Sequence, residues 1–322
     1  MHGWFLVETL LPDGQHTVVA DGAKPKQWAS LRRVRGELGS AVSDAIQVLV
    51  GDCVRDRQEH EQYVRGARGR DQLRVVGVPV FGPQQQVYGV QMWVGPDAVA
   101  PPPGRVAAFD WDVDKKVAQV TPEFGRYTGL EGDRATRSAP ELFSRVERFD
   151  NRLEYFAMLV DFAVGSHWQG ILAFRGNAGE LRTYALSART YVEGTNRRVR
   201  NLVHDVSESI APQQHLDLAN VRAIAASSDG VGLVGLDFGV IYNWVSPPAA
   251  PLDRWITEQA EFDDPEQFVA ACRQLRDRVA ERRSLGLRVR FDDSEWFDID
   301  VTLTVATFGP PAQGVIQVRL SA

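Results

Sequence analysis

The chain carries one pattern twice, as FDWDVDKKVAQVTP at residues 109–122 and as VGLDFGVIYNWVSP at residues 234–247. In each copy a short turn separates two apolar runs, which predicts a β-hairpin. Both copies end in a hydroxyl residue followed by proline. Their period exceeds about 100 residues, which indicates duplicated domains and not a solenoid of short repeats.

After each predicted hairpin, the sequence predicts a helix and then three strands. In the middle segment, Asp150 can cap a helix that we expect Gly165 to end. In the last segment, Asp264 and Pro265 mark a helix start, and Gly286 is the expected stop. The predicted strands are 168–174, 181–191 and 198–206 in the middle segment, and 287–291, 297–307 and 314–320 in the last.

The first segment has a similar plan. Strand patterns at 4–10 and 16–20 are followed by a helical stripe that we expect to end at Gly51. Two β-rich runs, 73–81 and 87–94, then predict a second hairpin.

The sequences that link these segments predict the domain boundaries. Three consecutive prolines at 101–103 favour an extended spacer, and an apolar stretch before the second copy predicts a joining helix. We therefore predict an α+β fold of three consecutive domains, each an antiparallel sheet of about five strands with helices packed on it. The predicted parts are a first domain at 1–96, a Pro-rich linker at 97–105, a middle domain at 106–209, a linker helix at 210–228 and a last domain at 229–322.

The middle segment resembles a PAS domain. TPEF at 121–124 and YTGL at 127–130 are similar to the PAS opening, and LVHDVSE at 202–208 resembles its closing signature. The resemblance implies that Asp205 ties the last strand to the outgoing linker helix and transmits the signal. The last segment has the same plan, but its end, VIQVRL at 315–320, lacks the closing signature.

The first segment resembles a GAF domain, since VGVPVFG at 76–82 and VYGVQ at 87–91 are similar to the GAF terminal hairpin. The whole chain therefore resembles the actinobacterial (mycobacterial) GAF–PAS–PAS triple-sensor proteins. This resemblance implies sensing of a small ligand or a protein partner.

Aromatic side chains are the candidate ligand-binding residues. The chain has eight tryptophans and fifteen phenylalanines, and in PAS folds the elements that carry several of them enclose a cavity. The alternative is that these side chains only fill the cores. The candidates are Trp111, Phe124, Tyr127, Phe156, Trp168 and Tyr184 in the middle segment, and Trp244, Trp255, Phe268 and Trp296 in the last.

Catalytic and metal-binding patterns are absent from the sequence. His204 precedes Asp205 as in a phosphoacceptor motif, but it lies in an alternating strand pattern and no nucleotide-binding motif accompanies it. Cys53 and Cys272 have no metal or disulfide spacing. His60, between two glutamates, is expected in a solvated helix or loop. We predict no enzymatic activity, no catalytic residue, no metal and no cofactor.

Composition bears on the partners and the cellular location that we expect for the protein. The chain of 322 residues has a net charge of -6, which disfavours a nucleic-acid partner. It has no apolar run of about 18 residues that could span a membrane, no signal-peptide pattern and only two cysteines, so we expect a cytoplasmic protein. Three sensor-sized domains use the whole length, so a separate protein would supply the output.

Two main hypotheses follow. The first is a non-enzymatic cytosolic sensor or adaptor that binds a small ligand or a protein partner and relays the signal by interdomain rearrangement. The alternative is a scaffold whose filled PAS cores mediate assembly, with a homodimer left open. A minor third hypothesis is an enzyme that uses Cys53 as its nucleophile.

Overall fold

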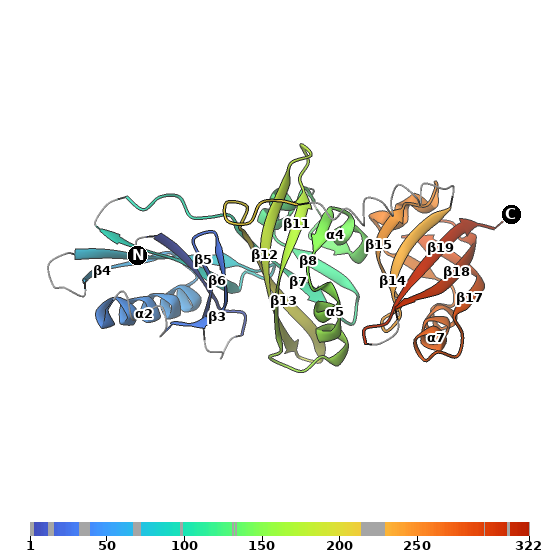
Figure 1. Cartoon of the computed structure of the whole chain (residues 1–322), viewed down its shortest axis with the longest axis horizontal. Helices are drawn as coiled ribbons and strands as arrows, with labels where there is room; N and C mark the ends of the chain where they lie inside the picture. Colours follow the sequence, from blue (N-terminus) through green and yellow to red (C-terminus); the bar gives the residue numbers. More distant parts are fainter. Residues whose placement is uncertain are drawn as a thin grey trace.

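Three antiparallel sheets follow one another along an elongated molecule (Figure 1). The computed structural model describes residues 3–11, 16–31, 39–66, 72–96, 99–130, 132, 134–213, 229–292, 294–307 and 310–321. The predicted linker helix at 210–228 lies almost wholly outside the described residues. The mixed helix-and-sheet class holds, with strands predominating.

The first sheet has the strand order β3-β2-β1-β6-β5-β4. One long helix, α2 (Ser40–Asp56), packs on β4, β5 and β6. Its buried side chains Val42, Ile46 and Leu49 recur at helical spacing, which explains why this face turns to the sheet. The strands are β1 (Gly3–Glu8), β2 (Thr17–Asp21), β3 (Lys24–Ser30), β4 (His60–Arg65), β5 (Gln72–Phe81) and β6 (Val87–Pro96).

The second sheet has the order β10-β11-β12-β13-β7-β8-β9. Its short helices are α3 (Pro122–Thr128), α4 (Ala139–Ser144) and α5 (Arg152–Asp161). Thr121 and Ser138 cap the first two, each accepting a backbone N–H three residues on. The strands are β7 (Val106–Asp112), β8 (Val117–Val120), β9 (Thr136–Ser138), β10 (Val146–Phe149), β11 (His167–Arg175), β12 (Leu181–Glu193) and β13 (Asn196–Asp205).

The third sheet has the order β15-β14-β19-β18-β17-β16. The 3-10 helix η1 (Leu252–Ile256) and the helix α7 (Pro265–Arg276) belong to this unit. Asp264 caps α7 by accepting the Gln267 N–H, as the sequence predicts. The strands are β14 (Gly230–Gly235), β15 (Val240–Ser246), β16 (Ala260–Phe262), β17 (Arg282–Phe291), β18 (Phe297–Thr307) and β19 (Gln313–Leu320).

All three sheets share one topology. The first strand of each unit pairs with its last strand, and the second strand lies on the other side of the first. The described strands number six, seven and six, where about five were expected. The additional strands include β9, β10 and β16, which have three or four residues and show no alternation long enough to detect.

Three predicted helix ends are wrong. Helix α2 continues past Gly51, because Cys53 still lies on its buried face, and it ends where Arg57 adopts a left-handed conformation. Helix α5 ends at Asp161, before Gly165. Helix α7 ends at Arg276, and Gly286 lies inside β17. His60, expected in a helix or loop, lies in β4 and contacts Asp56.

The first and second sheets pack back to back. Side chains at alternate positions of β7 and β13 point away from the helices of the second unit, among them Ala108 and Leu202. They form one buried cluster with Leu6 and Tyr88 of the first unit. Both faces of β7 are therefore buried, and all seven of its residues belong to the buried interior.

Leu202→Ala is expected to destabilise the protein by about 2–5 kcal/mol, because the side chain is 1% exposed at the centre of this cluster. Urea titration measures the loss. Leu320→Ala makes the same change where the side chain is 43% exposed, and is expected to cost less than about 0.5 kcal/mol. Equal costs for the two variants would contradict the packing described.

Candidate functional site

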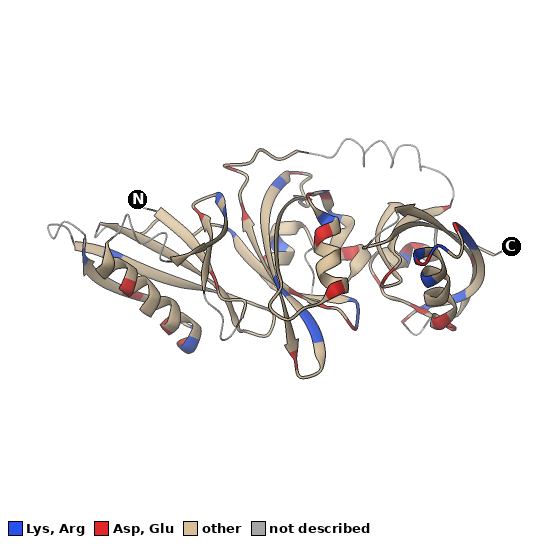
Figure 2. Ribbon diagram, turned by 60° about the horizontal axis from the view of Figure 1, so that its bottom comes forward, with Lys and Arg blue, Asp and Glu red and all other residues tan. Residues whose placement is uncertain are grey.

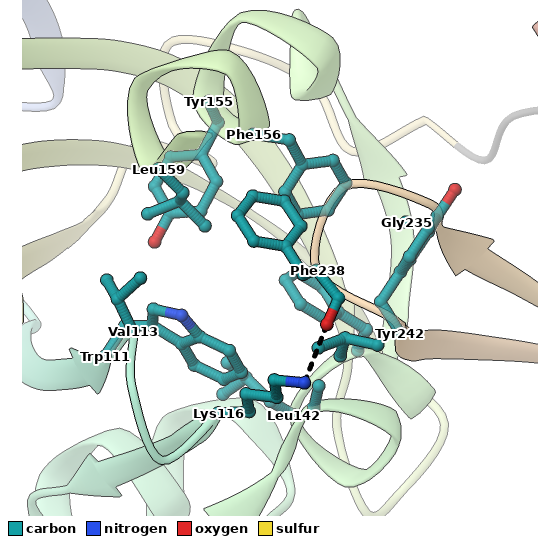
Figure 3. A pocket seen from close by; sticks show the side chains of 13 residues that line it. Trp111, Val113, Lys116, Leu142, Tyr155, Phe156, Leu159, Gly235, Phe238 and Tyr242 are labelled. Atoms are coloured by element: carbon teal, nitrogen blue, oxygen red, sulfur yellow. Dashed lines mark hydrogen bonds between the residues drawn. The ribbon is translucent and has the colours of Figure 1, made fainter. Parts of the chain in front are cut away.

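A small apolar cavity lies between the helices of the second unit and the β14–β15 hairpin of the third (Figure 3). The second unit contributes strand β7, the β7–β8 turn and helices α4 and α5. The lining residues are Trp111, Val113, Lys116, Ala139, Leu142, Phe143, Tyr155, Phe156 and Leu159 from the second unit, and Gly235, Phe238, Val240 and Tyr242 from the third.

The cavity is almost filled. Its volume is about 30 Å³, which is the space of roughly one water molecule. An apolar cavity of this kind gives a water molecule few polar partners. In this arrangement the side chains of the third unit therefore occupy most of the space that the second unit leaves open.

Tyr242 of the third unit is buried in the core of the second unit. It is 6% exposed and belongs to the core cluster of the second unit, with its ring 5.0 Å from that of Phe156. The centre of the Phe143 ring lies 6.2 Å from the centre of the Tyr242 ring. Burying an aromatic side chain contributes about 1.5–3 kcal/mol, so this residue gives a large share of the contact energy.

A β-bulge aims Tyr242 at the second unit. In the pairing of β14 with β15, Leu233 faces Asn243 and Val234 faces Ile241, so Tyr242 is the additional residue on β15. The bulge allows Ile241 and Trp244 to enter the core of the third unit together. Regular alternation would have placed these two on opposite faces.

The hairpin turn brings Phe238 to the cavity. Gly239 has a φ of 61°, a conformation that favours glycine, and its N–H donates to the Gly235 carbonyl. The Lys116 ammonium group donates to the Phe238 carbonyl at 2.6 Å, across the two units (Figure 3). Burial lowers the pKa of Lys116.

The structure brings two of the sequence candidates to this cavity, Trp111 and Phe156. Phe124, Trp168 and Tyr184 are buried in the core of the same unit, where the Tyr184 hydroxyl donates to the Tyr127 carbonyl at 2.8 Å. The half-buried Tyr127 ring lies under the guanidinium group of Arg105. Whether any of these side chains contacts a ligand stays a prediction.

The candidates of the third unit lie elsewhere. Trp244, Trp255 and Phe268 pack in the core of that unit. Trp255 and Phe268 also line an open hollow of about 570 Å³ beside α4. Trp296 is half-buried under the guanidinium groups of Arg288 and Arg290, outside the core cluster.

Sequence reasoning missed Lys116, Phe238 and Tyr242. Lys116 and Phe238 lie in the turns of the two predicted hairpins and Tyr242 in a predicted apolar run, where the sequence pattern did not mark them as cavity residues. The repeated hairpin is the one sequence signal that could have pointed to them, because Lys116 and Phe238 lie in the turns of its two copies.

A second junction lies between the first and second units. The Tyr88 hydroxyl of the first unit donates to Asp110 of the second at 2.6 Å, and Asp110 is fully buried. Arg200 donates to the Leu10 carbonyl and lies 3.9 Å from the centre of the Tyr191 ring. Burial raises the pKa of Asp110 to about 6.

Asp205 lies at the end of β13, beside this junction. One of its carboxylate oxygens accepts both the N–H and the hydroxyl of Ser207, and the other pairs with Arg182 at 3.1 Å. The carboxylate therefore ties the strand to the turn that follows it. Neighbouring His204 is 8% exposed, and burial lowers its pKa to about 4. These residues line an open hollow of about 510 Å³ against the first unit.

The cysteines are poorly placed for chemistry. Both are inaccessible to solvent, and burial raises the pKa of Cys53 to about 11 and that of Cys272 to about 12. Each is a protonated thiol at neutral pH, and a thiol is a poor nucleophile. Among the described residues, no cluster of three or more His, Cys, Asp or Glu side chains could hold a metal ion.

Comparisons with known proteins support the architecture. Residues 3–103 match the family described as Rv3651-like, N-terminal. A crystal structure of an uncharacterized protein from Mycobacterium tuberculosis is similar along the whole chain, with a TM-score of 0.78 at 22% identity, covering 100% of this chain and 97% of that one. This likeness shows a shared fold. Both findings fit an actinobacterial protein.

Other structural likenesses are too weak to carry an argument. An RNA-binding Light-Oxygen-Voltage receptor gives a TM-score of 0.28 at 12% identity, covering 67% of this chain and 95% of that one. The periplasmic sensory domain of the Campylobacter jejuni chemoreceptor Tlp1 gives 0.18 at 10% identity, covering 64% and 74%. No curated protein matches the sequence. In the described part of the chain, no helix is long and apolar enough to cross a membrane.

The two buried titrating groups predict opposite pH effects. The folded state holds a proton on Asp110 up to about pH 6, whereas the unfolded state releases it near pH 4, so this group adds stability as pH falls between these values. His204 acts in reverse, since the unfolded chain gains a proton below about pH 6.5 and the folded chain only near pH 4.

Asp110→Asn is therefore expected to lose stability more steeply than the parent chain between pH 6 and pH 4, and His204→Gln less steeply. Urea titrations across this range measure both slopes. Asp44→Asn, at an exposed position of α2, is the control and is expected to keep the parent slope. Parallel slopes for all four proteins would contradict the burial of both groups.

Proposed function

We propose that the protein is a non-enzymatic sensor or signalling adaptor with one GAF-like and two PAS-like domains. The observation that carries this proposal is the cavity of the second unit, which the third unit closes with Phe238 and Tyr242. Any ligand larger than a water molecule would need the space that these side chains occupy. Ligand binding and docking of the third unit would therefore exclude one another.

The proposed mechanism is a population shift between a docked and an undocked state. A ligand shifts such an equilibrium only by its differential affinity for the two states. Here the difference arises from sterics, because only the undocked state offers the full cavity. Undocking would also expose Leu233, Val240 and Tyr242 on the outer face of the third sheet, and these form an apolar surface for a separate protein partner.

The shared topology supports the domain assignments. Each unit pairs its first strand with its last strand in the interior of the sheet and places its helices on one face. This is the plan that the resemblance to GAF and PAS domains implies. Within it, we propose Asp205 as a transmission point, because its carboxylate joins β13 to the chain that leaves the second unit.

A cytosolic setting without a nucleic-acid partner belongs to the same proposal. Basic and acidic residues are interspersed over all three units (Figure 2). Nucleic-acid binding usually depends on a concentrated basic face. The buried, protonated thiols of Cys53 and Cys272 favour a protein that does no chemistry of its own.

The scaffold hypothesis is the second candidate, and one observation favours it. The cavity of about 30 Å³ is consistent with a core that is simply filled, in which the third unit is a permanent part of the second unit's packing. The two hypotheses differ in what the protein carries in its host, a small molecule or only other proteins.

Native mass spectrometry of the protein isolated from its own host separates these hypotheses. A sensor is expected to retain a small molecule in a fraction of the chains. A scaffold would show only its own copies or protein partners, and that result would contradict the sensor proposal.

Tyr242→Ala is expected to undock the third unit, because it removes the ring that completes the core of the second. The radius of gyration from solution scattering should increase, and the stability should fall by about 3–5 kcal/mol. Tyr63→Ala, at a side chain that is 44% exposed in the first unit, is the matched control and should change neither value. A scattering curve for Tyr242→Ala that matches the parent would contradict the docking mechanism.

A further inference from the structure

We propose that the cavity between the second and third units binds a small carboxylate with an apolar, phenyl-sized body, in the place of Phe238 and with its carboxylate on Lys116. This assignment rests on the proposed sensor function and names the ligand class of that site. It follows from the charge of Lys116, the apolar surroundings and the chemistry of the group that now occupies them.

Lys116 has no anionic partner in the part of the chain that the structure describes. Among the described residues, its ammonium group has one hydrogen-bond partner, the neutral carbonyl of Phe238, and no ion-pair partner. The surrounding cavity is lined by apolar side chains such as Trp111 and Leu142. The Lys116 side chain is partly buried, and even partial removal of a charge from water is costly unless the charge is paired. A carboxylate would satisfy it better than a carbonyl, because charge-assisted hydrogen bonds are roughly twice as strong.

Four acidic side chains near Lys116 pair with arginines, and a fifth, Asp292, is exposed at the hollow that Lys116 also borders. On its own hairpin, Asp114 pairs with Arg197 and Asp112 lies beside Arg198. In the open hollow that Lys116 also borders, Glu258 and Glu261 pair with arginines of the third unit. The protein therefore leaves the anion position at Lys116 to a neutral group of its own chain.

Phe238 presents a phenyl ring and a carbonyl oxygen joined by two carbon atoms and the carbonyl carbon. The molecule 3-phenylpropionate has the same spacing, with a carboxylate where the chain has the peptide carbonyl. Phe238 can thus be regarded as an intramolecular occupant that lacks only the negative charge. Phe238 is partly buried among the residues that line the cavity, and its carbonyl faces the Lys116 ammonium group (Figure 3).

To displace Phe238 from the cavity, a ligand would have to move the whole third unit away from the second. The base of the turn is held by the Asp237 carboxylate, which accepts the Ala312 N–H at 2.7 Å, and by the bond from Gly239 to Gly235. The turn is therefore fixed to its own sheet, so Phe238 would move together with the third unit. Binding of the carboxylate would be read out as loss of docking.

The test uses the full chain and two probes, 3-phenylpropionate and its neutral analogue 3-phenylpropanamide, in isothermal titration calorimetry. The parent is expected to bind the carboxylate about tenfold more tightly than the amide. Lys116→Met should remove this preference. Phe238→Ala should bind the carboxylate more tightly than the parent, because an intramolecular competitor has been removed.

Phe297→Ala is the matched control, since it removes a half-buried phenyl ring of the third unit that does not line the cavity. It should bind both probes as the parent does. The inference is overturned if Lys116→Met keeps the preference, if Phe238→Ala binds no more tightly than the parent, or if Phe238→Ala binds neither probe.

Failure of this inference is distinguishable from failure of the proposed function. If both probes bind equally and increase the radius of gyration, the carboxylate assignment is wrong and the sensor mechanism stands. If neither probe binds and protein from the host carries no small molecule, both are wrong.

Discussion

The core of the second unit depends on a side chain from the third. Tyr242 packs against Phe143 and Phe156 as a member of that core, although it belongs to a strand of the next sheet. On its opposite side, the second sheet packs on the first through Leu202 and the bond from Tyr88 to Asp110. The middle unit is thus covered on both faces, and its packing links the whole chain. A change in either contact would be felt in the second unit.

The repeated hairpin has acquired two roles. In the second unit its turn carries Lys116, and in the third unit the corresponding turn carries Phe238, so the turns of the two copies contact each other directly. The bulge at Tyr242 then lets one strand serve two cores. The duplicated hairpins thus form the contact between the duplicated domains. The same residues line the cavity where a sensor would bind its ligand.

Much of the fold could be predicted from periodicity and turn chemistry. The central strands of all three sheets and the start of α7 at Asp264 followed from alternation and capping. Helix ends did not, because a glycine such as Gly51 can occupy an exposed helical position while the buried stripe continues to Cys53. Short edge strands such as β9 and β16 carry too few residues for a pattern.

The candidate site was harder to predict for a physical reason. Trp111 and Phe156 lie on elements that enclose a cavity in any fold of this plan, so aromatic content pointed to them. Lys116 and Tyr242 gain their positions from contact between units, and a bulge reverses the side-chain alternation around Tyr242. Neither the bulge nor the contact between the units can be predicted from the pattern of a single sequence.

The central claim is that the third unit docks through the outer face of its sheet onto the open core of the second. Spin labels at Val192→Cys and Val279→Cys test it most directly, since both positions are exposed and the native cysteines are buried. The account predicts one narrow distance distribution, which becomes broad when Val240→Asp places a charge on the docking face. A distribution that is already broad in the labelled parent, or that stays narrow in Val240→Asp, would contradict it.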